Sequence, residues 1–267
     1  MDKRRQEKNF NLPSGKINKI YKKMQIKNAK IQQEFLKAGV HFGHLTRKWN
    51  PKIEPYILMK KKGIHLINLS KTIKKLEEAC NSLRTIASLG QKILFVCTKK
   101  QGKYVIEDFA RTVNMPYVTE RWIAGLLTNF STIRKSIKNM DDMENKKKEG
   151  IYDMLSKKER LFADRIQEKL KRNLSSISNL NQIPSALFIV DICKEHIALS
   201  EAKKLKIPVF AMVDTNSDPT KVDYPIPSND DSSKSIRVIA SYISKSILEG
   251  FNLRKTENEE NLYDFDL

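Results

Sequence analysis

Cysteine is scarce in this sequence, and its few copies are poorly placed for covalent or metal chemistry. Only three of 267 residues are cysteines, namely Cys80, Cys97 and Cys193. No two of them form a CxxC pair and their number is odd, which argues against a zinc ribbon or a disulfide framework. Each lies in a segment of periodic apolar residues, so we expect small core side chains in a reducing compartment.

Long apolar runs are also absent. None approaches the ~20 residues that a membrane-spanning helix needs, and the basic N-terminus lacks the apolar stretch of a secretion signal. That N-terminus is rich in lysine and poor in arginine, which fits an organelle transit peptide badly without excluding one. We therefore expect a soluble, intracellular protein.

The chain lacks the glycine-rich loops that cradle nucleotide phosphates. A nucleotide-binding enzyme would carry GxGxxG or GxxxxGK followed by Ser or Thr after an early strand. At that position this chain has only Gly102, surrounded by lysines that include Lys99 and Lys100. These lysines can contact a phosphate or remain in solvent, and the sequence favours neither reading.

Acidic residues are outnumbered by basic ones, 31 against 50, which gives a formal net charge of +19. Such a charge repels itself and favours a polyanionic partner. Charge alone leaves nucleic acid, an anionic membrane and an acidic protein open. Residues 1–30 hold ten basic and two acidic residues, so we expect a disordered basic arm, and we expect residues 251–267 to form a disordered acidic tail.

Two short apolar runs in the second half of the chain predict a βαβ unit. Residues 186–190 and 209–213 flank an amphipathic helical segment, whose inward face we assign to Ile197, Ala198, Ala202 and Leu205. Strands this apolar are buried on both faces, as in a parallel sheet. Each run ends in an aspartate, Asp191 or Asp214, at the sheet edge where α/β proteins keep their sites.

The first half continues the same rhythm. Strands are predicted over 64–69, 92–98 and 116–119, with amphipathic helices between them, which gives β–α–β–α–β. A final helix is predicted over 232–249. The fold class is therefore α/β, with a mostly parallel sheet between helices in a three-layer, Rossmann-like or flavodoxin-like arrangement formed by residues 31–129 and 178–250.

Residues 130–177 interrupt this rhythm. Two amphipathic segments, joined by a polar turn, predict an inserted antiparallel coiled-coil hairpin. Its second helix starts at a capping box, Ser156 to Glu159. Such a hairpin is more typical of a binding arm than of catalytic machinery, and a packed helical subdomain is the alternative.

Two groups of residues could hold a metal. Asp191, Asp214, Asp218 and Asp230 can converge at one sheet edge, although Asp is also an ordinary turn and cap residue. His41 and His44 are three residues apart, but no Cys or acidic residue lies near them in the sequence. We favour structural roles for both groups and expect no bound metal.

The segment FLKAGVHFGHLTRKWNPK, residues 35–52, combines cations with an aromatic ring. Trp49 lies among Arg47, Lys48 and Lys52, so it can stack on a base while the cations neutralise phosphates. We therefore favour an RNA contact for Trp49. For Trp122, which precedes an apolar turn, we favour core packing.

Several segments together resemble the bacterial ribosomal protein S2 family: AGVHFGHLTRKWNPK, KILFVCTKKQ, RWIAGLLTNFSTIRKS, ALFIVD, KEHIALSEAKKLKIPVFAMVDTNSDP and IPSNDDSSKSI. The resemblance covers Phe35 to Gly250. It implies a structural protein of the small ribosomal subunit that binds small-subunit rRNA, contacts other small-subunit proteins and helps to anchor ribosomal protein S1. It implies no catalysis, no cofactor and no membrane partner. It places the protein in the bacterial cytoplasm, and an organelle ribosome remains an alternative.

The resemblance and the basic loops together nominate RNA-contacting residues. They lie in the loop of residues 46–52, the following lysine patch, the turn after residue 98, the RW–LTN segment (residues 121–129) and the hairpin. They are Arg47, Lys48, Trp49, Asn50, Lys52, Lys60, Lys61, Lys62, Lys99, Lys100, Arg121, Thr128, Asn129, Arg134, Lys135, Lys138, Lys157 and Lys158.

Two rival function classes remain at this point. An α/β enzyme or small-molecule binder would use Asp191 and Asp214, but it would need a phosphate loop or a poised acid–base pair that the chain does not present. A protein-docking scaffold with the hairpin as its docking surface is compatible with the ribosomal reading. The family's usual start lies near the AGVHFGH motif, so residues 1–30 look like an extension or the result of a misplaced start codon.

Overall fold

The computed structural model describes residues 29–148 and 156–263. The predictions for the basic arm up to residue 28 and for the hairpin turn at 149–155 lie outside these residues. A first helix covers residues 29–38. The strands are β1 (Phe42–Leu45), β2 (Ile57–Lys61), β3 (Ile64–Ile67), β4 (Ile93–Val96), β5 (Tyr117–Val118), β6 (Ala186–Val190), β7 (Val209–Val213) and β8 (Tyr224–Pro227). The remaining α-helices are α2 (Leu69–Ser88), α3 (Lys103–Thr112), α4 (Phe130–Lys148), α5 (Lys157–Leu174), α6 (His196–Lys204) and α7 (Ser233–Tyr263).

A five-stranded parallel sheet forms the centre of the molecule, in the order β5-β4-β6-β7-β8. The residues of β4, β6 and β7 are all buried, as their unbroken apolar runs predict. An aromatic row crosses the sheet, because Phe95, Phe188, Phe210 and Tyr224 are successive partners in the register. The predicted βαβ unit and the parallel sheet are confirmed.

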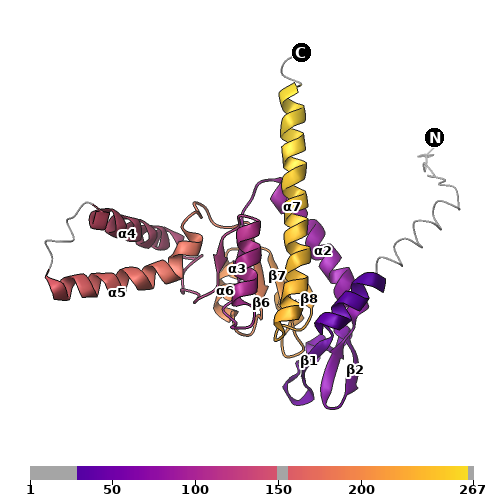
Figure 1. Ribbon diagram of the computed structural model, residues 1–267. Coiled ribbons are helices and arrows are strands. Elements are labelled where there is room, and N and C mark those ends of the chain that lie inside the picture. Colours follow the sequence, from indigo (N-terminus) through magenta and orange to yellow (C-terminus); the bar gives the residue numbers. More distant parts are fainter. Residues whose placement is uncertain (1–28, 149–155, 264–267) are drawn as a thin grey trace, which may run out of the picture.

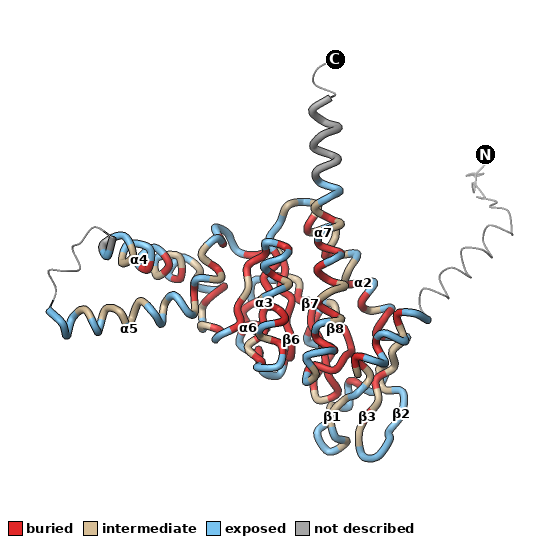
Figure 2. The backbone as a smooth tube through the Cα atoms, in the orientation of Figure 1, coloured by how far each residue is buried: buried red, intermediate tan, exposed pale blue. Residues whose placement is uncertain are grey.

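Helices cover both faces of this sheet, which makes three layers (Figure 1). One core cluster joins alternate strand residues such as Phe95 and Phe188 to α2, α3 and α7. The other joins their neighbours, such as Leu94 and Leu187, to α6, the 122–127 loop and the bases of α4 and α5. Figure 2 shows buried backbone concentrated at the sheet and along the inner sides of these helices.

A second, antiparallel sheet of three strands, in the order β1-β3-β2, lies beside the main one. The prediction that residues 64–69 belong to the parallel sheet is wrong, because β3 pairs with β1 and β2. Lys62 and Gly63 at the β2–β3 turn have φ of 50° and 76°, and positive φ at both central residues matches the right-handed twist of a tight hairpin. The sequence analysis did not predict β2, because its residues lead into a lysine-rich turn. It did not predict β1, because FGHL was assigned to a loop.

Strand β8 was also missed by the sequence analysis. Its sequence, YPIP, alternates with prolines, which donate no backbone hydrogen bond and are tolerated at a sheet edge. Because β8 is the last strand of the order, it needs to pair only with β7. The segment after Asp214 therefore contains an edge strand between its turns.

Helices α4 and α5 project together from one side of the sheet domain (Figure 1). Lys147 Nζ of α4 lies 2.7 Å from Asp164 Oδ1 of α5, which links the two helices far from their bases. Ser156 caps α5, and its reciprocal bond with Glu159 confirms the predicted capping box. Among the helices in the described ranges, none is long and apolar enough to cross a membrane.

Helix α7 continues beyond the predicted end at Glu249, as far as Tyr263. Gly250 does not stop it, because this glycine is a point of close approach to α2. A Cβ at Gly250 would lie 2.4 Å from the carbonyl oxygen of Arg84 and 2.9 Å from Ala87 Cβ. The same crossing carries an ion pair of 2.6 Å between Arg84 and Glu249.

We predict that Gly250→Ala destabilises the protein, although alanine favours helix by up to about 1 kcal/mol over glycine. The new methyl group must push α7 from α2, and overpacking of this kind costs about 1–3 kcal/mol. Chemical denaturation of Gly250→Ala and of the exposed control Lys245→Ala on the same helix checks this. Equal midpoints for Gly250→Ala and wild type would contradict the close approach.

Candidate nucleic-acid interface

The carboxyl ends of the parallel strands meet at a cluster of charged side chains, as the sequence predicts for Asp191, Asp214 and Asp230. The cluster has a cation at its centre. Lys99 Nζ lies 3.2 Å from Asp191, 2.6 Å from Asp230 and 2.7 Å from Asp231. The Lys99 residue is 9% exposed and Asp230 fully buried, so a single buried cation is shared by three carboxylates, of which Asp191 and Asp230 are also buried.

The protonation of this cluster follows from its burial and its charges. Burial opposes the charge of Lys99, but Asp230, Asp231 and Asp191 outweigh it and hold the pKa of Lys99 above its ordinary value. Burial raises the pKa of Asp230, and the charges of Asp214 and Asp191 raise it further. Lys99, a nominated RNA contact, is therefore engaged by carboxylates, and the sheet edge is filled by an internal ion network.

His44 extends this cluster toward the small sheet. Its Nδ1 lies 3.2 Å from Asp214 and its Nε2 lies 3.3 Å from Asp231, and Asp214 raises the pKa of His44. One ligand atom from each of these three residues lies within 4.8 Å of the others, a set that could hold a metal ion. The acidic neighbours that His44 lacks in sequence are thus supplied by the ends of β7 and β8.

His41 and Asp218 lie apart from this set. The ring of His41 packs on Phe42, with centroids 4.0 Å apart. Asp218 caps a short 3-10 helix, Pro219–Lys221, by accepting from the Thr220 backbone N–H. His41 therefore has the structural role that the sequence analysis favoured over metal binding with His44, and Asp218 has the ordinary cap role that it also favoured.

The loop of residues 46–52 presents its cations unevenly. Arg47 and Lys48 are exposed in a short 3-10 helix, and within the part of the chain that the structure describes neither forms an ion pair. Lys52 Nζ is bound to Asp218 at 2.8 Å. Trp49 is half-buried against the core and lies 5.0 Å from the His65 ring, while Asn50 caps the following 3-10 helix. The two residues that project freely are Arg47 and Lys48.

The other nominated cations are mostly exposed. Lys60 and Lys61 end β2, Lys62 lies in the β2–β3 turn, and Lys100 begins the turn before α3. On the hairpin, Lys135, Lys138, Lys157 and Lys158 are exposed. Arg134 differs, because its Nη1 donates to the carbonyl oxygens of Ser178 and Leu180 at 2.9 and 3.2 Å and fastens α4 to the chain after α5.

One buried carboxylate shapes the RW–LTN segment. Glu201 of α6 accepts hydrogen bonds from Trp122 Nε1 at 3.1 Å and from the backbone N–H groups of Gly125, Leu127 and Thr128 at 2.8, 3.0 and 3.2 Å. Burial alone would raise the pKa of Glu201, but these hydrogen bonds outweigh it and lower the pKa. The loop is wrapped around the carboxylate and leaves Arg121, Thr128 and Asn129 exposed.

Trp122 is buried at 7% exposure, so its predicted core role is confirmed. Glu201 was missed, because a lone glutamate in a helix reads as solvated. The structure also shows a different inward face for this helix. Ala198, Leu199 and Ala202 are buried, whereas Ile197 and Leu205 are 41% and 38% exposed. The predicted inward face of α6 was therefore rotated, and the true face places Glu201 among apolar neighbours.

The comparisons with known proteins agree along most of the chain. The sequence model of the family described as ribosomal protein S2 matches residues 35–250. A small ribosomal subunit protein uS2 of Christiangramia forsetii is 58% identical over 225 residues, which cover 84% of this chain and 75% of that protein. Its counterpart in Flavobacterium johnsoniae is 57% identical over 227 residues, 85% of this chain and 89% of that protein. The uS2 protein of Karelsulcia muelleri is 56% identical over 216 residues, which cover 81% of this chain and 97% of that protein.

We predict that Glu201→Gln lowers the free energy of unfolding by about 2–4 kcal/mol, because an amide cannot accept from all the N–H groups aimed at the carboxylate. Thermal melting and amide hydrogen exchange at Leu127 and Thr128 measure this, with the exposed Glu77→Gln as the matched control. The pKa of Glu201 is lower in the folded state, so its stabilisation is present above the unfolded pKa and is lost as pH falls through the folded pKa. Unchanged exchange at Leu127 and Thr128 would contradict the role of Glu201.

Proposed function

The chain belongs to the ribosomal protein S2 family, and we propose on that premise that it is a structural component of the small ribosomal subunit in the bacterial cytoplasm. In this role it binds small-subunit rRNA and neighbouring ribosomal proteins and catalyses no reaction. The observation that carries the proposal is the family match over residues 35–250. The distribution of charge supports it, because the carboxylates at the sheet edge are paired internally while most nominated cations are exposed.

We propose that rRNA contacts the exposed cations of four regions. These are the 46–52 loop with the β2–β3 turn, the turn before α3, the RW–LTN segment held by Glu201, and the α4–α5 hairpin. Lysine and arginine at such positions neutralise phosphates and release counterions, which gives affinity without base reading. The contact residues that fit this role are Arg47, Lys48, Lys60, Lys61, Lys62, Lys100, Arg121, Thr128, Asn129, Lys135, Lys138, Lys157 and Lys158.

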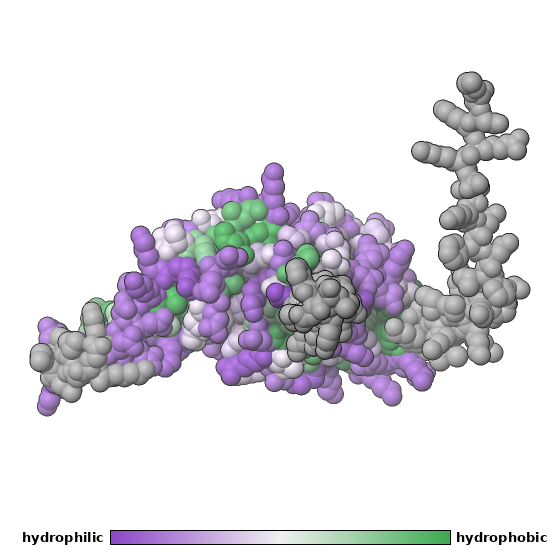
Figure 3. Space-filling view, turned by 90° about the horizontal axis from the view of Figure 1, so that it is seen from above, coloured by the Kyte–Doolittle hydropathy of each residue, from purple (hydrophilic) through white to green (hydrophobic). Residues whose placement is uncertain are grey.

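We infer that α4 and α5 pack as an antiparallel coiled coil and act as an arm. Ile133, Ile137 and Met140 are buried on α4 at the spacing of an apolar seam. The outward side is strongly polar, and Figure 3 shows hydrophilic residues over most of the molecule seen from above, the hairpin side included. A rigid arm of this kind can reach RNA that the sheet domain does not touch.

We propose that ribosomal protein S1 docks on the outer face of the small sheet, defined by Phe42, Leu45, Met59, Ile64 and Leu66. Phe42 and Met59 both pair with Leu66, so they share one face of the sheet. Phe42, Leu45 and Met59 are 47%, 43% and 52% exposed. A contiguous exposed apolar face marks a protein contact, and the resemblance to the family implies S1 as the partner.

For the RNA surface, we expect Arg47→Ala with Lys48→Ala to reduce incorporation into small subunits roughly tenfold against wild type. Each lost phosphate contact also lowers the salt slope of binding by about 0.7–0.9. Quantitative mass spectrometry of subunits from cells that express both forms gives the ratio. The control Lys203→Ala with Lys204→Ala on α6 removes the same charge. If the Arg47/Lys48 variant is incorporated as well as the wild type, these two residues do not contact the rRNA as proposed.

For the docking face, we expect Met59→Asp to lower the S1 content of purified small subunits roughly tenfold or more, because it places a charge at an apolar contact. The variant itself should still be incorporated. Leu89→Asp, at an exposed leucine beyond the end of α2, is the matched control. A normal S1 content with Met59→Asp would show that S1 docks elsewhere.

A further inference from the structure

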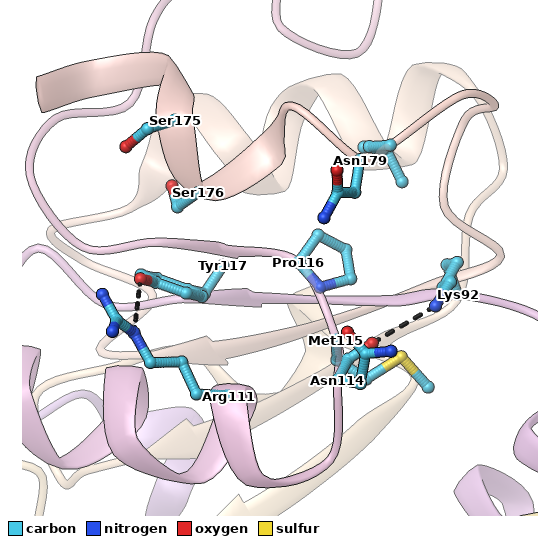
Figure 4. A pocket seen from close by; sticks show the side chains of 10 residues that line it. Lys92, Arg111, Asn114, Met115, Pro116, Tyr117, Ser175, Ser176 and Asn179 are labelled. Carbon is cyan, nitrogen blue, oxygen red and sulfur yellow. Dashed lines mark hydrogen bonds between the residues drawn. The ribbon is translucent and has the colours of Figure 1, made fainter. Parts of the chain in front are cut away.

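A pocket of about 240 Å³ lies at the base of the hairpin, at the outer edge of the main sheet. Its floor is β5 with the residues just before it, and its roof is the short 3-10 helix Ser175–Ile177 that follows α5. Figure 4 shows side chains from both walls turned toward the space between them. The bonds from Arg134 to Ser178 and Leu180 fix this roof to α4.

The two ends of the pocket are cationic. Lys92 and Arg111 lie at opposite ends of the view in Figure 4, and both are exposed. Lys92 Nζ donates to the carbonyl oxygen of Asn114 at 3.2 Å, which uses one of its three N–H donors. Arg111 uses Nε on Tyr117 Oη at 3.0 Å and Nη2 on Glu107 at 2.7 Å. Among the described residues that line the pocket, none carries a carboxylate.

Between these cations the lining suits a planar, polar group. The buried Pro116 and the half-buried Tyr117 both line the strand side of the pocket, and Tyr117 is held in place by hydrogen bonds with Arg111 and Glu107. Ser176 and Asn179 face this floor from the roof (Figure 4). An aromatic floor with amide and hydroxyl groups opposite can stack a base and bond its edge.

We propose that this pocket takes one nucleotide of a single-stranded RNA segment. The base lies over Tyr117 and Pro116, with its edge toward Ser176 and Asn179, and the phosphates on its two sides meet Lys92 and Arg111. An internal nucleotide has a phosphate on each side, whereas a free mononucleotide has one, so two separated cations favour the strand. The inference rests on the proposed rRNA-binding function and deepens it.

Met115 supplies a local probe, because it lines the pocket and is buried at 4% exposure. The full chain is labelled with ¹³C at its methionine methyl groups and titrated with uridine 3′,5′-bisphosphate, with uridine 5′-monophosphate and with inorganic phosphate. We expect a saturable shift of the Met115 methyl signal, with the bisphosphate binding more tightly than the other two. The remaining methionines report any binding elsewhere.

Variants sharpen the test. Tyr117→Ala should weaken binding of the bisphosphate about five- to a hundredfold through lost stacking, whereas Tyr117→Phe keeps the ring and should stay within a few-fold of wild type. Lys92→Gln and Arg111→Gln should each abolish the advantage of the bisphosphate over the monophosphate. Lys74→Gln on α2 removes the same charge away from the pocket and should leave it unchanged.

Three results would overturn the proposal: no saturable Met115 shift, equal affinity for bisphosphate and monophosphate, or full binding by a folded Tyr117→Ala variant. Incorporation of the chain into small subunits is measured separately. A chain that enters small subunits and shows no Met115 shift refutes the pocket and leaves the ribosomal function standing.

Discussion

Lys99 places one buried ammonium group among the ends of three parallel strands. It follows β4, and its carboxylate partners Asp191 and Asp230–Asp231 follow β6 and β8. Asp231 also approaches His44 of β1, so the network ties the small sheet to the main one. Removing one partner of a buried ion pair typically costs about 3–5 kcal/mol, because the other charge is left uncompensated. Together with the hydrogen bond from the His44 N–H to Thr215 Oγ1 at 2.7 Å, this network joins the two sheets.

The same network occupies the edge of the sheet where ligands usually bind. In open α/β sheets the carboxyl ends of the strands usually hold the ligand, and a poised acid–base pair there would have supported an enzyme. Here Asp191, Asp230 and Asp231 form ion pairs with the internal Lys99. The exposed cations lie on loops, on the β2–β3 turn and on the projecting α4–α5 hairpin. The sheet domain thus carries the charged segments that we propose as RNA contacts, and Glu201 fixes one of these segments through buried hydrogen bonds.

The sequence predicted those parts whose signal is local. Unbroken apolar runs located β4, β6 and β7, and the capping box located the start of α5. The strands β1, β2 and β8 were missed because their sequences contain charged, polar or proline residues and so lack the unbroken apolar run that marks a buried strand. The site was predictable only in outline: strand ends located the aspartates, but the pairing of Lys99 and the burial of Glu201 arise from contacts between residues far apart in the chain.

Sedimentation of a lysate from the source cells through a sucrose gradient tests the central claim most directly, with the chain followed by mass spectrometry across a series of salt concentrations. If the protein is a structural component of the small subunit held by phosphate contacts, it travels with small subunits at low salt. It then leaves them only as salt rises, because counterion release makes such binding steeply salt-dependent. A chain that stays at the top of the gradient at every salt concentration would contradict the account.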